Sequence, residues 1–193
     1  MNSARTYTMT ARARSMEQTR IRILDATAEL YSERLVAEIG LEQVAERAGV
    51  SVQTVLRHFG SRDGLVEAAL AHALASVEEE RRVPTGEPDA AVHALVGHYE
   101  VRGDGVLLML AQEGSHELMR RVTDNGRRMH RTWVEEVFAP YVADAADPEA
   151  LTDLLVVATD VYAWKLLRRD RGLSRNQTES RMRALVGAVL TTP

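Results

Sequence analysis

The chain has 193 residues, 45% of them hydrophobic, and a net charge of −4 at pH 7. This length is enough for one substantial core, or for a small module of about 50 residues beside a larger one. The lack of cysteine excludes disulfides, thiolate nucleophiles and cysteine-based zinc sites. No apolar run approaches the roughly 18 residues of a membrane span, and no apolar stretch follows the N-terminal arginines, so we expect a cytoplasmic protein without a signal peptide.

The N-terminal segment is basic, whereas the chain as a whole is acidic. Residues 1–22 hold five arginines and a single acidic residue, Glu17. A basic arm on an acidic body is typical of a protein that contacts nucleic-acid phosphates at one end. We expect residues 1–15 to form a basic, flexible arm.

Apolar residues recur at helical spacing along nearly the whole chain, and no segment shows the alternation of a strand. The predicted fold class is therefore all-α, with about nine helices. The first four are predicted at about 16–34, 41–48, 52–58 and 62–82. Turns are predicted at Gly40, Gly49 and Gly60, and Ser51 and Ser61 are suitable N-caps for the helices that follow them.

Pro84, Gly86 and Pro88 form the clearest internal break in the chain. Beyond it, helices are predicted at 89–102, 106–112, 115–141, 148–169 and 174–190. This pattern predicts a second helical unit after the break.

The helix pair within residues 42–59 has the clearest functional meaning. Two short helices joined by a tight glycine turn are the arrangement that places a recognition helix in the DNA major groove. On the outer face of the second helix, Gln53 suits adenine, and Arg57 suits guanine or a phosphate. The alternative interpretation is a polar, solvent-facing helix in an ordinary bundle.

Several short motifs together resemble the DNA-binding domain of the TetR family over about residues 17–66. They are Ile23-Leu24-Asp25-Ala26, Leu30-Tyr31, Val44-Ala45-Glu46-Arg47-Ala48-Gly49-Val50-Ser51, Arg57-His58-Phe59 and Ser61-Arg62-Asp63-Gly64-Leu65. Two positions depart from the family, which usually has tyrosine in place of Leu56 and lysine in place of Arg62. Leu56 cannot donate a hydrogen bond to phosphate, whereas Arg62 still can, beside a helix N-terminus.

The resemblance implies a helix-turn-helix domain at 16–66, followed by a helical ligand-binding and dimerisation domain at 67–193. It also implies a repressor that binds a near-palindromic operator in double-stranded DNA as a homodimer and is released by a small, largely apolar effector. The alternatives are a regulator controlled by a protein partner or by no ligand, and an unrelated interaction module or enzyme. No cofactor, metal or enzymatic activity is expected, because Glu113 and His116 supply only half of a di-iron motif. The candidate DNA contacts are Arg20, Gln43, Ser51, Val52, Gln53, Thr54, Arg57, His58 and Arg62.

The predicted C-terminal domain supplies the remaining candidates. Apolar residues cover two faces of its last two helices, which predicts a four-helix dimer interface, although both faces could instead be internal core. The candidate interface residues are Leu151, Ala158, Leu166, Leu167, Leu185, Val186 and Val189. Large or polar residues on predicted core faces are candidates for a ligand pocket, although each of them could be ordinary core. They are Tyr99, Met109, Glu113, His116, Met129, Tyr162 and the two first choices, Trp133 and Trp164.

Overall fold

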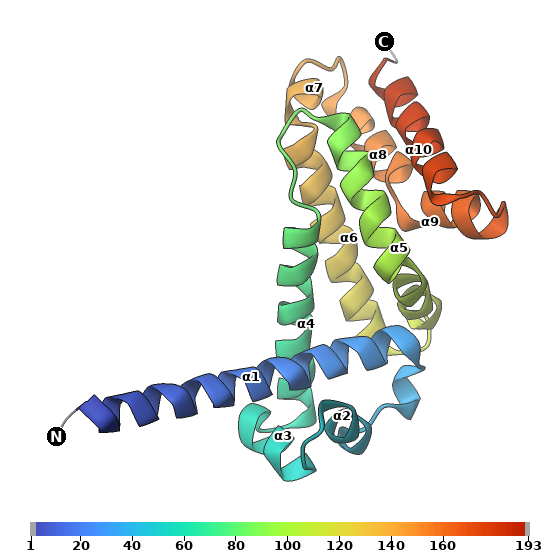
Figure 1. Ribbon diagram of the computed structural model, residues 1–193. Helices are drawn as coiled ribbons and strands as arrows, with labels where there is room; N and C mark the ends of the chain where they lie inside the picture. The colour runs from blue at the N-terminus through green and yellow to red at the C-terminus, as the bar shows by residue number, and fades with distance from the viewer. Residues whose placement is uncertain (1–2, 192–193) are drawn as a thin grey trace. The chain divides into compact units, whose positions relative to one another are not determined.

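The computed structural model describes the backbone of residues 3–191 and the side chains of residues 13–191. The described chain is helical and contains no strand, which confirms the all-α prediction (Figure 1). It forms two compact units, Met1–Ala75 and Ser76–Pro193. The division lies inside the fourth helix, whereas the sequence places the boundary after residue 66.

The first unit contains α1 (Ser3–Glu33), a short 3-10 helix (Val36–Glu38), α2 (Leu41–Ala48), α3 (Val52–Phe59) and most of α4 (Arg62–Glu80). The first helix begins at Ser3 rather than at Met16, so helical backbone replaces most of the predicted flexible arm. No glycine or proline interrupts this segment, and alanine, arginine and methionine favour a helix.

The core of the first unit gathers apolar side chains from all of its α-helices. Its largest fully buried members are Ile23, Leu24, Leu30, Val44, Val55 and Leu65. Helix α2 packs against both α1 and α3. This core therefore packs against one face of the short helix pair α2–α3 and leaves the opposite face exposed.

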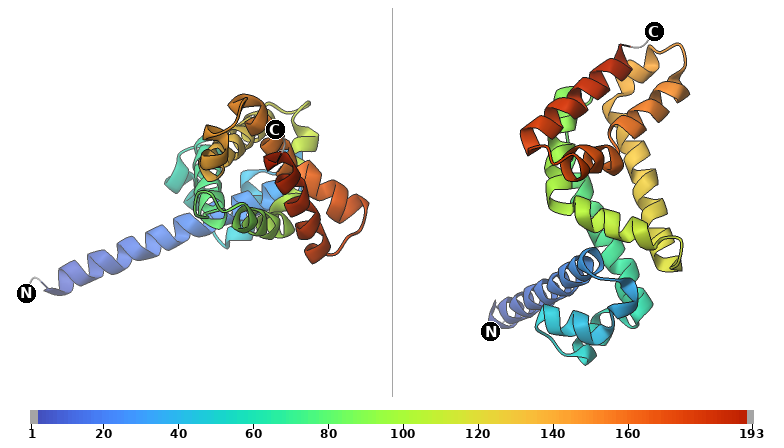
Figure 2. Two further views of the ribbon diagram at one scale, coloured as in Figure 1. Left: turned by 90° about the horizontal axis from the view of Figure 1, so that it is seen from above. Right: turned by 90° about the vertical axis from the view of Figure 1, so that its right-hand side faces the viewer.

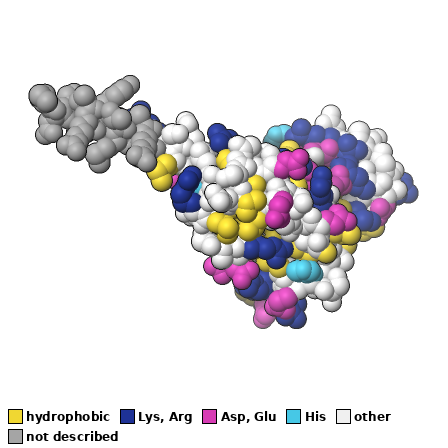
Figure 3. All heavy atoms as spheres, turned by 90° about the horizontal axis from the view of Figure 1, so that it is seen from below, with side chains coloured by type: hydrophobic (Ala, Val, Ile, Leu, Met, Phe, Trp, Pro, Cys, Tyr) yellow, Lys and Arg dark blue, Asp and Glu magenta, His cyan; other side chains and the backbone are white. Residues whose placement is uncertain are grey.

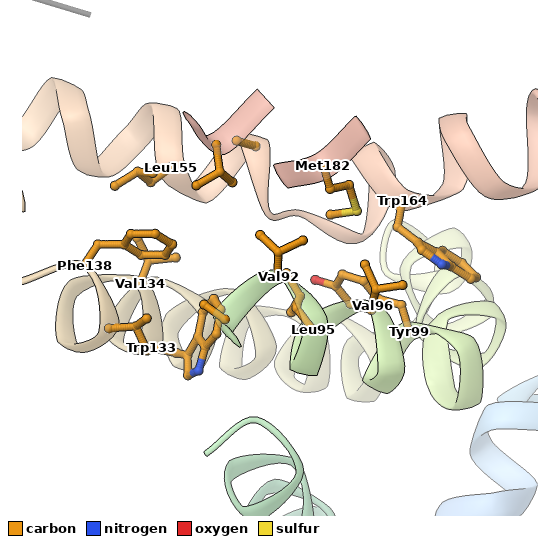
Figure 4. Packing of buried hydrophobic residues seen from close by; sticks show 14 of the residues in the cluster. Val92, Leu95, Val96, Tyr99, Trp133, Val134, Phe138, Leu155, Trp164 and Met182 are labelled. Carbon is orange, nitrogen blue, oxygen red and sulfur yellow. The ribbon is translucent and has the colours of Figure 1, made fainter. Parts of the chain in front are cut away.

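The second unit contains α5 (Pro88–Gln112), α6 (Glu117–Val137), α7 (Ala139–Ala143), α8 (Pro148–Ala158), α9 (Val161–Lys165), a π-helical turn (Leu166–Asp170) and α10 (Arg175–Leu190). Helix α5 packs against α6 and α10, and α8 packs against the same two helices (Figure 2). Val92, Leu95 and Val96 of α5 belong to one buried cluster with Val134 of α6 and with Phe138, the residue that follows α6. Leu155, Met182 and Trp164 complete this cluster (Figure 4).

Helix α5 corrects the first of the helix predictions in this unit. The sequence predicts two helices separated by Gly103 and Gly105, but the observed helix runs through both glycines. Gly103 lies against the indole ring of Trp164, where a β-carbon would approach the ring to 2.5 Å. The glycine therefore permits close packing in mid-helix and does not end the helix.

Two longer predicted helices are each divided in the structure. The predicted helix 148–169 breaks at residues 159–160, because Asp160 starts a new helix by accepting a hydrogen bond from the backbone N–H of Tyr162 (2.8 Å). The predicted helix 115–141 divides at Phe138, directly before the turn that contains Pro140. Across the described helices, none is long and apolar enough to cross a membrane.

Candidate functional site

Helices α2 and α3 form a tight, internally capped pair. The backbone N–H of Gly40 donates to Oε1 of Gln43 (2.8 Å) at the start of α2, and Gly49 ends that helix with a φ of 65°. Ser51 then caps α3 by accepting from the backbone N–H of Thr54 (3.2 Å). Only glycine adopts such a positive φ without strain, so this turn fixes the angle between the two helices.

The outer face of α3 combines exposed polar groups with one apolar residue. Ser51, Gln53 and Arg57 are exposed, and Val52, Thr54 and His58 are partly buried. Leu56 is 38% exposed on the same short helix. Figure 3 faces the side on which α2 and α3 lie and shows hydrophobic side chains among arginines and acidic residues. Arg57 has no ion-pair partner among the described side chains, and its role as a DNA contact stays a prediction.

Three other predicted DNA contacts already have structural roles. The Gln43 carbonyl oxygen caps α2, which leaves its amide N–H groups as donors. The Arg62 guanidinium donates to the Ile39 carbonyl oxygen (3.2 Å), and the Arg20 guanidinium lies 5.5 Å from the centre of the Phe59 ring. Each arginine keeps unused N–H donors near the helix pair, so both stay predicted phosphate contacts.

The second unit contains a pocket of about 520 Å³ between the end of α4, the segment that follows it and α6. Trp133 and Met129 line it, together with Arg81, Val83 and Val137. The Trp133 indole N–H donates to the backbone carbonyl of Arg81 (2.9 Å), which joins the two walls. Two of the predicted ligand residues, Trp133 and Met129, therefore lie in one pocket.

The other six predicted ligand residues do not line this pocket. Tyr99 and Trp164 are buried in the core, where the phenol donates to the Thr159 carbonyl (3.0 Å) and the indole to Glu100 (3.0 Å). The Glu113 carboxylate accepts hydrogen bonds from Thr123 and Arg127 (both within 2.7 Å). Tyr162 is 51% exposed. The remaining two are Met109 and His116, and the ligand role of all six stays a prediction.

A buried polar chain that the sequence does not reveal runs from Arg81 into the core. Arg81 donates to Nδ1 of His130 (3.3 Å), and Nε2 of His130 lies 3.1 Å from the Thr159 hydroxyl oxygen. The Thr159 hydroxyl donates onward to the Leu155 carbonyl oxygen (2.6 Å). Since Arg81 has only donors, His130 accepts at Nδ1 and carries its proton at Nε2. In the sequence, Arg81 and His130 look like polar residues of solvated helix faces.

Burial keeps two histidines of this region neutral. Burial and the nearby Arg81 charge lower the pKa of His130 to about 3. The same two causes lower the pKa of His98 to about 4, although its Nδ1 lies 2.8 Å from a Glu80 carboxylate oxygen. Both folded-state pKa values are thus below the ordinary value of 6.5.

We therefore expect the protein to lose stability as the pH falls below 6.5. Above that pH both histidines are neutral in either state, and their contribution to stability is complete. Between pH 6.5 and about 4 these two histidines are protonated in the unfolded chain but stay neutral in the folded chain. This difference in proton binding lowers the unfolding free energy by about 1.4 kcal/mol per pH unit for each histidine. Urea unfolding at several pH values measures this slope. His130→Gln should reduce it and the exposed-site control His93→Gln should not; a wild-type slope in His130→Gln would contradict the assignment.

The predicted dimer residues differ in exposure. Leu166 and Leu185 are 59% and 43% exposed. Leu151, Leu167 and Val189 are partly buried. Two predictions need correction, because Ala158 and Val186 are each 1% exposed and belong to the core of their own chain. Their small and β-branched side chains fill space between α8, α5 and α10, so they offer no surface to a second subunit.

Comparisons with known proteins agree with this structure. Residues 23–69 match the family model of bacterial regulatory proteins, tetR family. The HTH-type transcriptional regulator BetI of Burkholderia mallei is 30% identical over 155 residues, which cover 74% of this chain and 79% of BetI. A transcriptional regulator from Rhodococcus sp. Rha1 superposes with a TM-score of 0.67 at 19% identity, covering 90% of this chain and 99% of its own. A tetR-family regulator from Streptomyces coelicolor gives 0.63 at 19% identity, with 88% and 81% covered.

The capped helix pair with its exposed polar face defines a helix-turn-helix DNA-binding protein. Together with the relatives, it shows that the chain belongs to the TetR family of bacterial transcriptional regulators, as the sequence motifs predict.

Proposed function

We propose that this regulator is a repressor that binds a near-palindromic operator as a homodimer and leaves it when a small molecule occupies the second unit. The observation that carries the proposal is the exposed polar face of α3, with Gln53 and Arg57 open to solvent beside a rigid turn. A recognition helix of this kind reads one half-site, and a two-fold pair of them reads two half-sites about 34 to 36 Å apart.

An exposed apolar surface on the second unit supports the homodimer. Leu154 and Val157 of α8 are 48% and 67% exposed, and Leu185 of the neighbouring α10 is 43% exposed. Tyr162 and Leu166, between these two helices in the chain, are more than half exposed. Burial of these side chains against the same surface of a second copy forms a four-helix interface, and a stable pair of this kind buries about 2,000 Å² or more.

We expect Val157→Glu to convert the protein to a monomer and to abolish operator binding. The substitution places a carboxylate in the apolar surface of both copies, and burying it unpaired is strongly unfavourable. A monomer then holds only one half-site, which supplies too few contacts for specific binding. Sedimentation measures the mass, and fluorescence anisotropy with DNA from upstream of the gene measures operator affinity.

Val101→Glu is the matched control, because Val101 is an 82% exposed apolar residue on another helix, α5. It should leave both the dimer and the operator affinity unchanged. A wild-type protein that sediments as a monomer at micromolar concentration, or a dimeric Val157→Glu variant, would show that the subunits do not meet through α8.

The pocket supports a small-molecule effector over a protein partner. Its volume of about 520 Å³ lies in the range of ligand sites, and it has an aromatic wall at Trp133. Helix α4 begins in the first unit and ends at the pocket, so it provides a covalent path for a conformational change. Release requires the ligand to prefer the DNA-incompetent state, and a hundredfold preference corresponds to about 2.7 kcal/mol.

A further inference from the structure

Arg81 is a buried cation without a buried anion. It is 5% exposed, and no acidic side chain in the described part of the chain forms an ion pair with it. The preceding residue, Glu80, is held instead by His98 (2.8 Å) and by the Arg102 guanidinium (2.9 Å). A guanidinium removed from water without an anionic partner is unfavourable, so its presence needs a reason.

The described groups that hydrogen-bond to the Arg81 side chain or stack on it are neutral. Nη1 donates to the neutral imidazole of His130, and the guanidinium carbon lies 5.3 Å from the centre of the Tyr99 ring. The Tyr99 phenol keeps its proton, because burial raises its pKa to about 12. The Arg81 Nε atom is buried and has no hydrogen-bond partner among the described residues. The side chain therefore has both an unsatisfied charge and an unsatisfied donor.

Arg81 also lines the pocket of about 520 Å³. Beside it lie the apolar side chains of Val83, Met129 and Val137 and the indole of Trp133. The carboxylates of Glu78 and Glu136 line the same pocket from exposed positions, where they repel a second negative charge at the rim. Arg82 lines the pocket too, but it is exposed and already pairs with Glu79. The favourable place for an anionic group is therefore next to Arg81, with its apolar part against the aromatic wall.

We propose that the pocket binds a small organic acid whose carboxylate pairs with Arg81. The proposal rests on the effector role proposed above and names the chemical class of the effector. A planar guanidinium matches a carboxylate in shape and charge, and hydrogen bonds between ionised partners are about twice as strong as neutral ones. Inorganic phosphate would satisfy the charge but would leave the apolar wall unused.

The experiment compares acids with neutral compounds of the same shape on the dimer of the 193-residue chain. The probes are 1-naphthylacetate, its methyl ester, octanoate, octan-1-ol and inorganic phosphate, and binding is followed by calorimetry and by tryptophan fluorescence. The variants are Arg81→Gln, which keeps a donor for His130 but removes the charge, and Arg81→Lys, which keeps the charge. Arg82→Gln is the matched control, because Arg82 lines the same pocket but is exposed and pairs with Glu79 (2.6 Å).

We expect wild-type protein to bind an acid about tenfold or more tightly than its neutral counterpart, as one charge-assisted hydrogen bond warrants. Arg81→Gln should remove this preference, and Arg82→Gln should keep it. If Arg81→Gln does not fold, two other measurements still test the proposal. They are the ratio of acid affinity to ester affinity in the wild type and the same ratio in Arg81→Lys, which keeps the charge. Equal binding of acid and ester, binding of phosphate as tight as that of the acids, or no binding of either acid overturns the proposal.

The same titrations with operator DNA present separate this inference from the proposed function. If an acid binds through Arg81 but leaves the operator complex intact, the proposal of a repressor released by an effector is contradicted. The proposal of an anion site at Arg81 is then retained. If the ester or the alcohol releases DNA and neither acid binds, the proposal of an anion site is contradicted. The proposed function as a repressor released by a small molecule is then retained.

Discussion

The double substitution Gln53→Ala/Arg57→Ala is expected to reduce operator binding to the level of unrelated DNA. Both side chains are exposed on the outer face of α3, and neither is needed for the core or for a cap. Removing the hydrogen bonds to one base costs about 1 to 3 kcal/mol, and a dimer makes each of these interactions twice. Fluorescence anisotropy with the operator and with a scrambled duplex, at one fixed salt concentration, measures the loss of specificity.

The salt dependence of the single variant Arg57→Ala separates a base contact from a phosphate contact. If Arg57 binds phosphate, the variant binds all sequences more weakly, and the salt slope falls by about one for each phosphate that is no longer neutralised. If it reads a base, the slope is kept and discrimination between sequences disappears. Arg34→Ala is the control, at an exposed arginine beyond the end of α1. Wild-type operator affinity in the double variant would remove α3 from the recognition role.

Leu56 changes the contacts that α3 can make with DNA. An exposed leucine cannot donate to a phosphate, but it can make an apolar contact with a thymine methyl group in the major groove. The phosphate contact that tyrosine often supplies in the family then falls to other donors. We predict that Arg20 and Arg62 supply it, since each keeps unused N–H donors close to the helix pair.

The helix pair α2–α3 could be predicted closely from the sequence because its signals are local. Gly49 and Ser51 end and start helices by their own backbone preferences, and the observed α2 has the predicted bounds. The glycines of α5 show the limit of such reasoning. A glycine inside a helix indicates either a break or a close contact, and only the position of Trp164, far along the chain, decides which.

The pocket proposed for an effector could be predicted only in part. Trp133 and Met129 were identifiable as large apolar residues on a predicted core face, and both line the pocket. Arg81 was not identifiable, since it adjoins Arg82 at a helix end and the two look alike in the sequence. Their difference is tertiary, because Arg81 meets His130 and Tyr99 across the core whereas Arg82 faces solvent.

The contact between Gly103 and Trp164 leads to a second prediction with a large effect, on stability. A β-carbon at position 103 would lie 2.5 Å from Cζ3 and 2.7 Å from Cη2 of the Trp164 ring. The ring has little room to move, since it is fully buried, donates to Glu100 (3.0 Å) and lies 4.5 Å below the guanidinium of Arg169. Overpacking of this kind costs about 1 to 3 kcal/mol.

We therefore expect Gly103→Ala to destabilise the second unit by about 1 to 3 kcal/mol, in spite of the better helix propensity of alanine. The matched control is Gly126→Ala in the middle of α6, where a β-carbon meets no atom within 4 Å and alanine should stabilise the helix by about 0.5 to 1 kcal/mol. Urea unfolding monitored by tryptophan fluorescence measures both changes. If the two variants shift stability by the same amount in the same direction, the close approach of Trp164 does not determine the choice of glycine at position 103.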